Sequence, residues 1–212
     1  MIISEYIAAH RDHPITHQML LSSLKDYKRP NDKISNLLKE GELLSVKKGL
    51  YVIGPRSGKS RPESFLTANH ILGPSYVSLD SALSYHGLIP ERVYEISSMT
   101  TKSTRKFKTP IGVYAYYNLP LPYYAFGITR LQMNENQFAM VASPEKALFD
   151  KVVTTKGVLF RSKKQVVDYL IENLRMDESA LLNLDFSSMK SWIADSPKKE
   201  SLQVMLNTIE KL

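Results

Sequence analysis

The chain has 212 residues, of which 43% are hydrophobic, so it can bury one large core or two modest ones and is too apolar to be disordered. Its formal net charge is +7, and the absence of cysteine excludes disulfides, thiolate zinc sites and cysteine nucleophiles. The first residues include an early acid and no long apolar run, and no segment reaches membrane-spanning length. We therefore expect a cytoplasmic protein without membrane contact.

The positive charge is concentrated near the amino terminus. Residues 1–61 contain 11 Lys/Arg and 6 Asp/Glu, a balance of +5, whereas residues 62–212 contain 17 and 15, a balance of +2. This asymmetry is typical of a nucleic-acid-binding segment. A mildly basic soluble protein would show it equally well, so charge alone leaves both readings open.

The first sixty residues predict three helices followed by a hairpin. Apolar spacing predicts a helix over residues 2–10, a second from Thr16 to residue 24, and a third that Asn31 or Asp32 caps and Gly41 ends. Two short apolar strands, 43–46 and 50–53, follow with Gly49 in their turn. Helix, turn, helix and basic hairpin is the order of a winged helix-turn-helix DNA-binding domain.

In this interpretation, polar and basic side chains of three segments face the duplex. The third helix would supply donors to base edges, the hairpin tip would reach a flanking groove or the backbone, and the start of the second helix would meet a phosphate. The alternative is an ordinary surface helix and hairpin with solvated lysines. The predicted contacts are Thr16, His17, Gln18, Lys28, Arg29, Lys33, Asn36, Lys39, Lys47 and Lys48.

Residues 54–61, GPRSGKSR, have the composition of a linker, so we predict domains at 1–60 and 61–212. The second domain reads as a mixed α/β fold with a helical carboxy-terminal part, which makes the whole chain α+β. We expect helices over 62–71, 78–86, from Ser143-Pro144-Glu145 onward and throughout the region after Ser162, and strands over 93–99, 111–117, 124–129 and 138–141.

Two features of this region have more than one interpretation. The segment Thr101–Lys108, TKSTRKFK, is a basic connection between two strands, either a solvated loop or a second contact for an anion. The second feature is a dense group of tyrosines, which could stack bases but more often fill a sheet core. These tyrosines are Tyr114, Tyr116, Tyr117, Tyr123 and Tyr124.

No motif predicts catalysis, a metal site or a cofactor. The segment 54–60 has three residues between its glycines where a phosphate loop needs four, and it lacks the βαβ context. His10, His13 and His17 are separated by Pro14 and have no obvious fourth ligand. Ser81 and His86 share one helix at a spacing that does not bring them together. We therefore expect a protein that is not an enzyme.

Three segments together resemble the AbiEi antitoxin family of bacterial abortive-infection systems. They are KEGELLSVKKGLYVI, YVSLDSALSYHGLIPERVYEISSMTTKSTRKFKTPIGVYAYYNL and VASPEKALFDKV, and the likeness covers about residues 5–155. The residues that carry it are the Gly-Leu-Tyr of residues 49–51, the Ser78–Gly87 helix and the run from Ser143 to Leu148. Their order and spacing in one chain are more specific than any one of them.

The resemblance implies a type IV toxin–antitoxin regulator. Such proteins bind inverted repeats in their own promoter through an amino-terminal winged helix and repress the operon. Their carboxy-terminal domain counteracts a nucleotidyltransferase-like toxin without a stable toxin complex, and two copies would associate on the repeat. For this chain, DNA contact falls on Arg29–Lys39 and Lys47-Lys48. The alternative is a stand-alone winged-helix regulator whose second domain senses a ligand or mediates oligomerisation.

Overall fold

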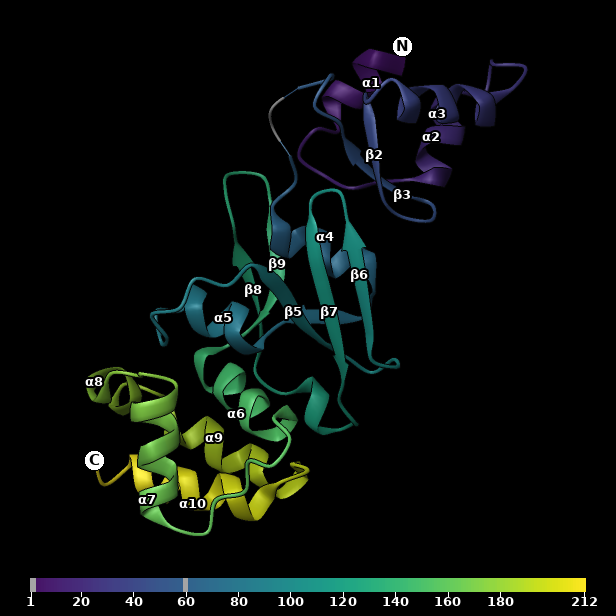
Figure 1. Ribbon diagram of the computed structural model, residues 1–212. Helices are drawn as coiled ribbons and strands as arrows, with labels where there is room; N and C mark the ends of the chain where they lie inside the picture. The colour runs from purple at the N-terminus through teal and green to yellow at the C-terminus, as the bar shows by residue number, and fades with distance from the viewer. Residues whose placement is uncertain (1–2, 59–60) are drawn as a thin grey trace.

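The computed structural model describes residues 3–58 and 61–212, and three parts follow one another along it (Figure 1). We call them the amino-terminal unit (residues 3–58), the sheet unit (61–160) and the helical unit (161–212). The predicted boundary at residue 60 lies outside the described residues. In the described ranges, no helix is both long enough and apolar enough to cross a membrane.

The amino-terminal unit consists of three helices and a small antiparallel sheet of order β1-β3-β2. Its core forms where Ile7, Leu20 and Leu37, each fully buried, meet from the three helices. The elements follow the predicted order, with the short strand β1 added before the second helix. They are α1 (Ile3–Ala9), β1 (Ile15–Thr16), α2 (His17–Ser23), α3 (Pro30–Lys39), β2 (Leu43–Lys47) and β3 (Leu50–Ile53).

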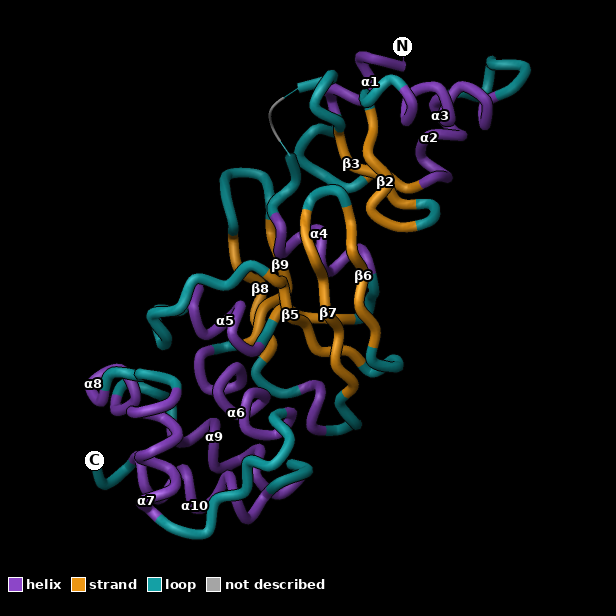
Figure 2. Tube along the Cα trace, in the orientation of Figure 1, coloured by secondary structure: helices purple, strands orange, loops and turns teal. Residues whose placement is uncertain are grey.

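The sheet unit is built on a mixed six-stranded sheet of order β6-β7-β5-β4-β9-β8, visible as strands in Figure 2. β5 pairs with β7 and β4 with β9 in parallel, and the other neighbours are antiparallel. The strands are β4 (Ser75–Val77), β5 (Glu95–Thr100), β6 (Arg105–Thr109), β7 (Gly112–Asn118), β8 (Ile128–Gln132) and β9 (Phe138–Ala142). The helices are α4 (Ser64–Ile71), α5 (Leu79–Tyr85), the single turn η1 (Tyr123–Ala125) and α6 (Pro144–Thr154).

Helices cover both faces of this sheet. Tyr116 of β7 donates its hydroxyl to the carbonyl oxygen of Ala68 in α4, at 2.6 Å, so α4 lies on the face of Tyr116. Tyr76 of β4 donates to Asp150 of α6, at 2.9 Å, on the opposite face. Tyr114, Tyr116 and Tyr123 are almost fully buried, which confirms that these tyrosines fill the core.

The helical unit completes the same core. Its last helix buries Leu202, Met205, Leu206 and Ile209 on one face. The unit contains only helical elements in its described residues, in agreement with the sequence pattern after Ser162. They are α7 (Lys163–Val167), the π-helical turn η2 (Asp168–Asn173), α8 (Glu178–Leu182), α9 (Phe186–Trp192), η3 (Ile193–Asp195) and α10 (Lys199–Ile209).

The hairpin β2–β3 packs into two cores at once. Leu43, Tyr51 and Ile53 belong to the core of the amino-terminal unit. A second set, Val46, Leu50 and Val52, belongs to the large core of the sheet and helical units. The hairpin therefore packs against both the amino-terminal unit and the rest of the chain. Its strand β2 lies beside β6.

Three secondary-structure predictions for the sheet unit need correction. Residues 105–109, predicted as part of a connection, form the edge strand β6. The strand predicted over 124–129 begins only at Ile128, because residues 123–125 form a helical turn. The third correction is an addition, because no strand was predicted over residues 75–77, which form β4.

Candidate nucleic-acid interface

Helix α3 is an amphipathic helix whose polar side stays open to solvent. Ile34 and Leu37 are buried against the unit's core, while Asn36 and Lys39 are exposed and Lys33 is half-buried. Asp32 in the first turn and Lys39 in the last turn complement the helix dipole. Among the described residues, no hydrogen bond or ion pair engages the side chains of Lys33, Asn36 or Lys39. Three donors thus stand free along the outside of this helix.

The start of α3 differs from the prediction. Arg29 occupies the N-cap position and Pro30 the first helical position, so neither Asn31 nor Asp32 caps the helix. Proline fits there because its fixed φ suits the helix and the first amide needs no partner. Arg29 lies 3.8 Å from Asp32 and remains 84% exposed in its side chain. Lys28 is also exposed, so the turn before α3 presents two cations to solvent.

The start of α2 is occupied mainly by contacts within the unit. Thr16 caps the helix, as predicted, and its hydroxyl oxygen accepts a hydrogen bond from the amide of Met19. Nδ1 of His17 lies 3.2 Å from the hydroxyl of Tyr51 in β3, and the His17 amide donates to the carbonyl oxygen of Gly49 at 2.9 Å. These contacts hold α2 to the hairpin and leave Gln18 as the exposed member of the predicted trio.

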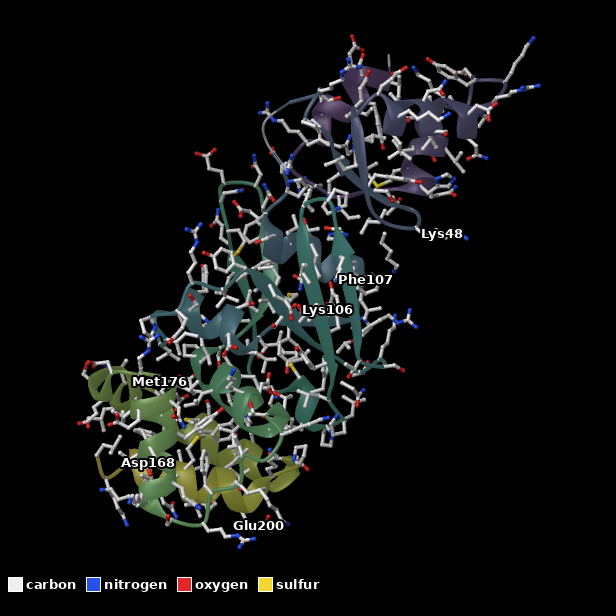
Figure 3. All side chains as sticks on the ribbon, viewed as in Figure 1. Lys48, Lys106, Phe107, Asp168, Met176 and Glu200 are labelled. Atoms are coloured by element: carbon white, nitrogen blue, oxygen red, sulfur yellow. The ribbon has the colours of Figure 1, made fainter. Side chains whose placement is uncertain are left out.

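The two lysines of the hairpin tip differ in their surroundings. Lys47 donates from Nζ to the carbonyl oxygen of Ile71 in α4 at 2.8 Å, so its ammonium is turned toward the sheet unit. Lys48 is exposed, with no partner among the described residues, and points away from the hairpin in Figure 3. Gly49 has φ +79°, a conformation that glycine adopts without strain, and it closes the turn between the strands. Only Lys48 is therefore free to meet a polyanion directly.

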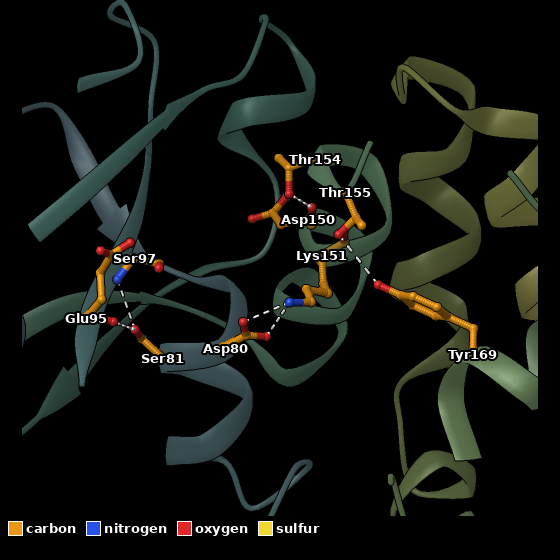
Figure 4. Close-up of polar contacts among 9 residues, drawn as sticks. All are labelled: Asp80, Ser81, Glu95, Ser97, Asp150, Lys151, Thr154, Thr155 and Tyr169. Carbon is orange, nitrogen blue, oxygen red and sulfur yellow. Dashed lines mark hydrogen bonds and ion pairs between the residues drawn. The ribbon is translucent and has the colours of Figure 1, made fainter. Parts of the chain in front are cut away.

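A second candidate site is a groove between the sheet and α6 (Figure 4). A cavity of about 260 Å³ is lined by Asp80, Glu95, Ser97, Lys151 and Thr154, among others. Lys151 forms an ion pair with Asp80 at 2.6 Å, and Glu95 pairs with Lys106. The charges that line this groove are thus largely neutralised by one another.

The hydroxyl groups around this groove are also in use. Ser81 donates to the carbonyl oxygen of Glu95 at 3.0 Å and accepts from the amide of Ser97 at 2.9 Å. Thr154 donates to the carbonyl oxygen of Asp150. His86 contacts the carbonyl oxygen of Ala142 at 2.8 Å, and this bond holds it away from Ser81. The network fastens α5 and α6 to the sheet, and it pairs no nucleophile with a base.

A fully buried ion pair lies beneath the groove. Nζ of Lys146 is 2.9 Å from Asp150 one turn along α6, and both side chains have no exposed surface. Tyr76 and Ser78 donate to the other carboxylate oxygen at 2.9 and 2.8 Å. Burial lowers the pKa of Lys146, and the charge of Asp150 opposes that shift. Ser78 occupies the N-cap position of α5, but its hydroxyl donates to this buried carboxylate and accepts no hydrogen bond from the helix amides.

The histidines considered as metal ligands are engaged in other contacts. Nδ1 of His10 lies 2.8 Å from the carbonyl oxygen of Tyr6, and His17 is engaged with Tyr51. Across residues 3–58 and 61–212, no group of three or more His, Asp or Glu side chains is arranged to hold a metal ion. The candidate site that we consider further is the set of exposed cations of the amino-terminal unit.

No protein-family model matches the sequence, and comparison with curated proteins finds no significant match. Among solved structures, the chain is similar to the crystal structure of the Rv2827c protein from Mycobacterium tuberculosis, with a TM-score of 0.64. The similarity covers 98% of this chain and 76% of that chain at 13% sequence identity. At this identity the comparison establishes a shared fold and nothing about activity.

Proposed function

We propose that this chain is a duplex-DNA-binding regulator whose amino-terminal unit is a winged helix-turn-helix. The observation that carries the proposal is the free polar side of α3, with Lys33, Asn36 and Lys39, next to a hairpin tip that presents Lys48. In Figure 1, α3 lies at the far end of the unit from the sheet, so the sheet unit does not cover it.

The dimensions of the helix suit the major groove. A helix of 10 residues is about 15 Å long and, with its side chains, about as wide as the groove of B-DNA. Asn36 can form two hydrogen bonds to one adenine edge, while Lys33, Lys39 and Arg29 supply cations for phosphates or guanine. Lys48 would contact the backbone beside the groove. The order of three helices followed by a hairpin supports this proposal.

The test is binding to the region upstream of the chain's own gene, with single variants on α3. We expect Asn36→Ala to relax base preference, and Lys33→Ala or Lys39→Ala to weaken binding to all sequences while the fold stays intact. Lys163→Ala, on exposed α7 at the far end of the molecule, is the matched control. If all three α3 variants bind DNA with wild-type affinity, α3 is not the helix that contacts the bases.

The biological role that we propose follows the sequence resemblance. The chain would repress its own promoter by binding inverted repeats, with two copies associating on the DNA, and residues 61–212 would counteract a nucleotidyltransferase-like toxin of the type IV class without a stable complex. Support comes from the resemblance carried by residues 78–87 and 143–148, which here form α5 and the start of α6. We propose that the chain acts in the cytoplasm. We propose no catalytic step, metal or cofactor for it.

The second candidate is a stand-alone regulator whose sheet unit senses a ligand, and the groove between α6 and the sheet is the observation that favours it. Gene neighbourhood distinguishes the two, because an antitoxin requires an adjacent nucleotidyltransferase-like reading frame. Co-expression then tests the pair directly: the chain should restore growth to cells that express the neighbour. Growth arrest that persists despite the soluble chain would exclude the antitoxin role.

A further inference from the structure

The strand β6 forms a cationic edge of the central sheet. It occupies one end of the strand order, and residues 101–106 leading into it are all exposed. The segment from residue 96 to residue 118, which runs from β5 through β6 to β7, contains no Asp or Glu, yet it holds Lys102, Arg105, Lys106 and Lys108. Glu95 neutralises Lys106, and the remaining cations give this edge a net positive charge.

This edge continues the surface of the hairpin. β2 and β6 lie side by side, and the apolar side chains of the hairpin pack in the same core as Phe107 of β6. The residues from 43 to 62 contain no acid either. Figure 3 shows Lys48 projecting just above β6, on which Lys106 and Phe107 are labelled. The cations of the two units are therefore neighbours along one side of the molecule.

Two of the cations of β6 are free to contact a ligand. Lys106 forms an ion pair with Glu95, and Lys102 donates to the carbonyl oxygen of Gly73. Arg105 and Lys108 are exposed and have no partner among the described residues. The register with β7 puts them on opposite faces of the edge strand, so a polyanion that runs along the edge can be reached from both.

Edge strands often carry lysine simply to prevent pairing with another chain. That explanation accounts for the lysines of β6. It does not account for the absence of Asp and Glu from residues 43–62, which include the hairpin, and from residues 110–118, which include β7. Alternate residues of an edge strand also turn their amide N–H groups outward, where they can donate to phosphate oxygens. The cations of β6 and its outward N–H groups would therefore both favour a partner that carries phosphates.

We propose that the β6 edge extends the DNA-binding surface, with Arg105 and Lys108 contacting backbone phosphates that flank the segment read by α3. The inference rests on the proposed DNA-binding function. It assigns to the sheet unit a contact that is independent of base sequence, so the footprint reaches beyond the amino-terminal unit. The amino-terminal unit and the sheet unit, which are joined through the hairpin, would bind one duplex together.

The test uses the full chain and a labelled random-sequence duplex of about 30 bp, with affinity measured against salt concentration. The double variant R105A/K108A should bind several-fold more weakly, and its plot of log affinity against log salt should be less steep than wild type by about 2. The matched control is K163A/K164A, which removes the same charge from exposed residues of α7. We expect the control and the conservative variant R105K/K108R to keep the wild-type slope.

Each outcome bears on the inference. A wild-type slope in R105A/K108A, or an equal loss in K163A/K164A, would overturn it, since the effect would then be absent or due to net charge. If K39A and K48A weaken binding while R105A/K108A does not, the proposed function stands and only the β6 contact fails. If wild type does not bind any duplex, the proposed function fails and this inference with it.

Discussion

The ammonium of Lys47 donates to the carbonyl oxygen of Ile71, and this bond joins the hairpin tip to the end of α4. The neighbouring Lys48 makes no such contact. Lys47 therefore joins the amino-terminal unit to the sheet unit, whereas the adjacent Lys48 faces solvent. Apolar packing of Val46, Leu50 and Val52 lies behind the same strands.

We predict opposite phenotypes for these two lysines. Lys47→Met keeps the aliphatic stem but loses the hydrogen bond, so the free energy of unfolding should fall by about 1 kcal/mol while the salt dependence of DNA binding changes little. Lys48→Met should leave stability unchanged and reduce the salt slope by about 1. Chemical denaturation and salt titration of both variants check this. A slope reduced more by Lys47→Met than by Lys48→Met would contradict the assignment.

Because the hairpin β2–β3 packs in both cores, we predict that the amino-terminal unit and the sheet unit unfold together. Leu50→Ala removes a buried side chain from the large core, which should cost about 2–4 kcal/mol of unfolding free energy. Leu159→Ala makes the same chemical change at a side chain that is 55% exposed, and it should cost less than about 0.5 kcal/mol. Denaturant unfolding monitored by fluorescence and by circular dichroism gives both values.

The same experiment tests cooperativity. Because the hairpin contributes to both cores, we expect a single transition for wild type at both probes. A fragment of residues 62–212 would lack Val46, Leu50 and Val52 and should be less stable than the intact chain. Two separate transitions in wild type, with one unaffected by Leu50→Ala, would show that the hairpin does not couple the units.

Elements with strong local signals were predicted correctly from sequence. The start of α6 at Ser143-Pro144-Glu145 combines a capping hydroxyl, a proline at the first position and an acid in the first turn, and the structure has each in place. The hairpin was equally clear, because a glycine with positive φ separates two apolar runs. Both signals lie within a few residues of one another and need no tertiary partner.

Features that depend on distant partners were missed. β6 reads as a basic loop because Arg105, Lys106 and Lys108 surround its one large apolar residue, Phe107, and only pairing with β7 makes it a strand. Lys47 reads as a free tip residue because Ile71 lies far along the chain. Local sequence placed the cations of the candidate site but could not indicate which of them the fold engages.

The buried pair in α6 gives a further prediction. Asp150→Asn leaves the ammonium of Lys146 without its counter-charge inside the core, and this should cost about 3–5 kcal/mol. Lys146→Met should be similarly costly, because it strands a buried carboxylate. The double variant K146M/D150N should cost less than the sum of the two, because neither charge then remains buried without its partner.

A double-mutant cycle on the free energies of unfolding measures this coupling. The partly exposed ion pair of Lys151 with Asp80 is a suitable comparison, since solvent screening should leave it a coupling of about 1 kcal/mol or less. If the costs of Lys146→Met and Asp150→Asn are simply additive, the two side chains do not stabilise each other in solution.

The buried tyrosines predict a loss of stability at alkaline pH. Burial raises the pKa of Tyr114 to about 12, and it raises the pKa of Tyr76, Tyr116 and Tyr123 as well. In the unfolded chain these hydroxyls lose their protons near pH 10.0. Between pH 10.0 and the raised values, the folded state binds more protons than the unfolded state, so the free energy of unfolding falls as pH rises through that window.

Ultraviolet absorbance of tyrosinate follows this titration directly. Its amplitude reports how many of the 12 tyrosines have ionised. Tyr76, Tyr114, Tyr116 and Tyr123 should ionise only as near-ultraviolet circular dichroism is lost, because ionisation and unfolding are linked. In denaturant all twelve should titrate together, which provides the control. Ionisation of every tyrosine in one reversible step with the near-ultraviolet signal unchanged would mean that the sheet core is open to solvent.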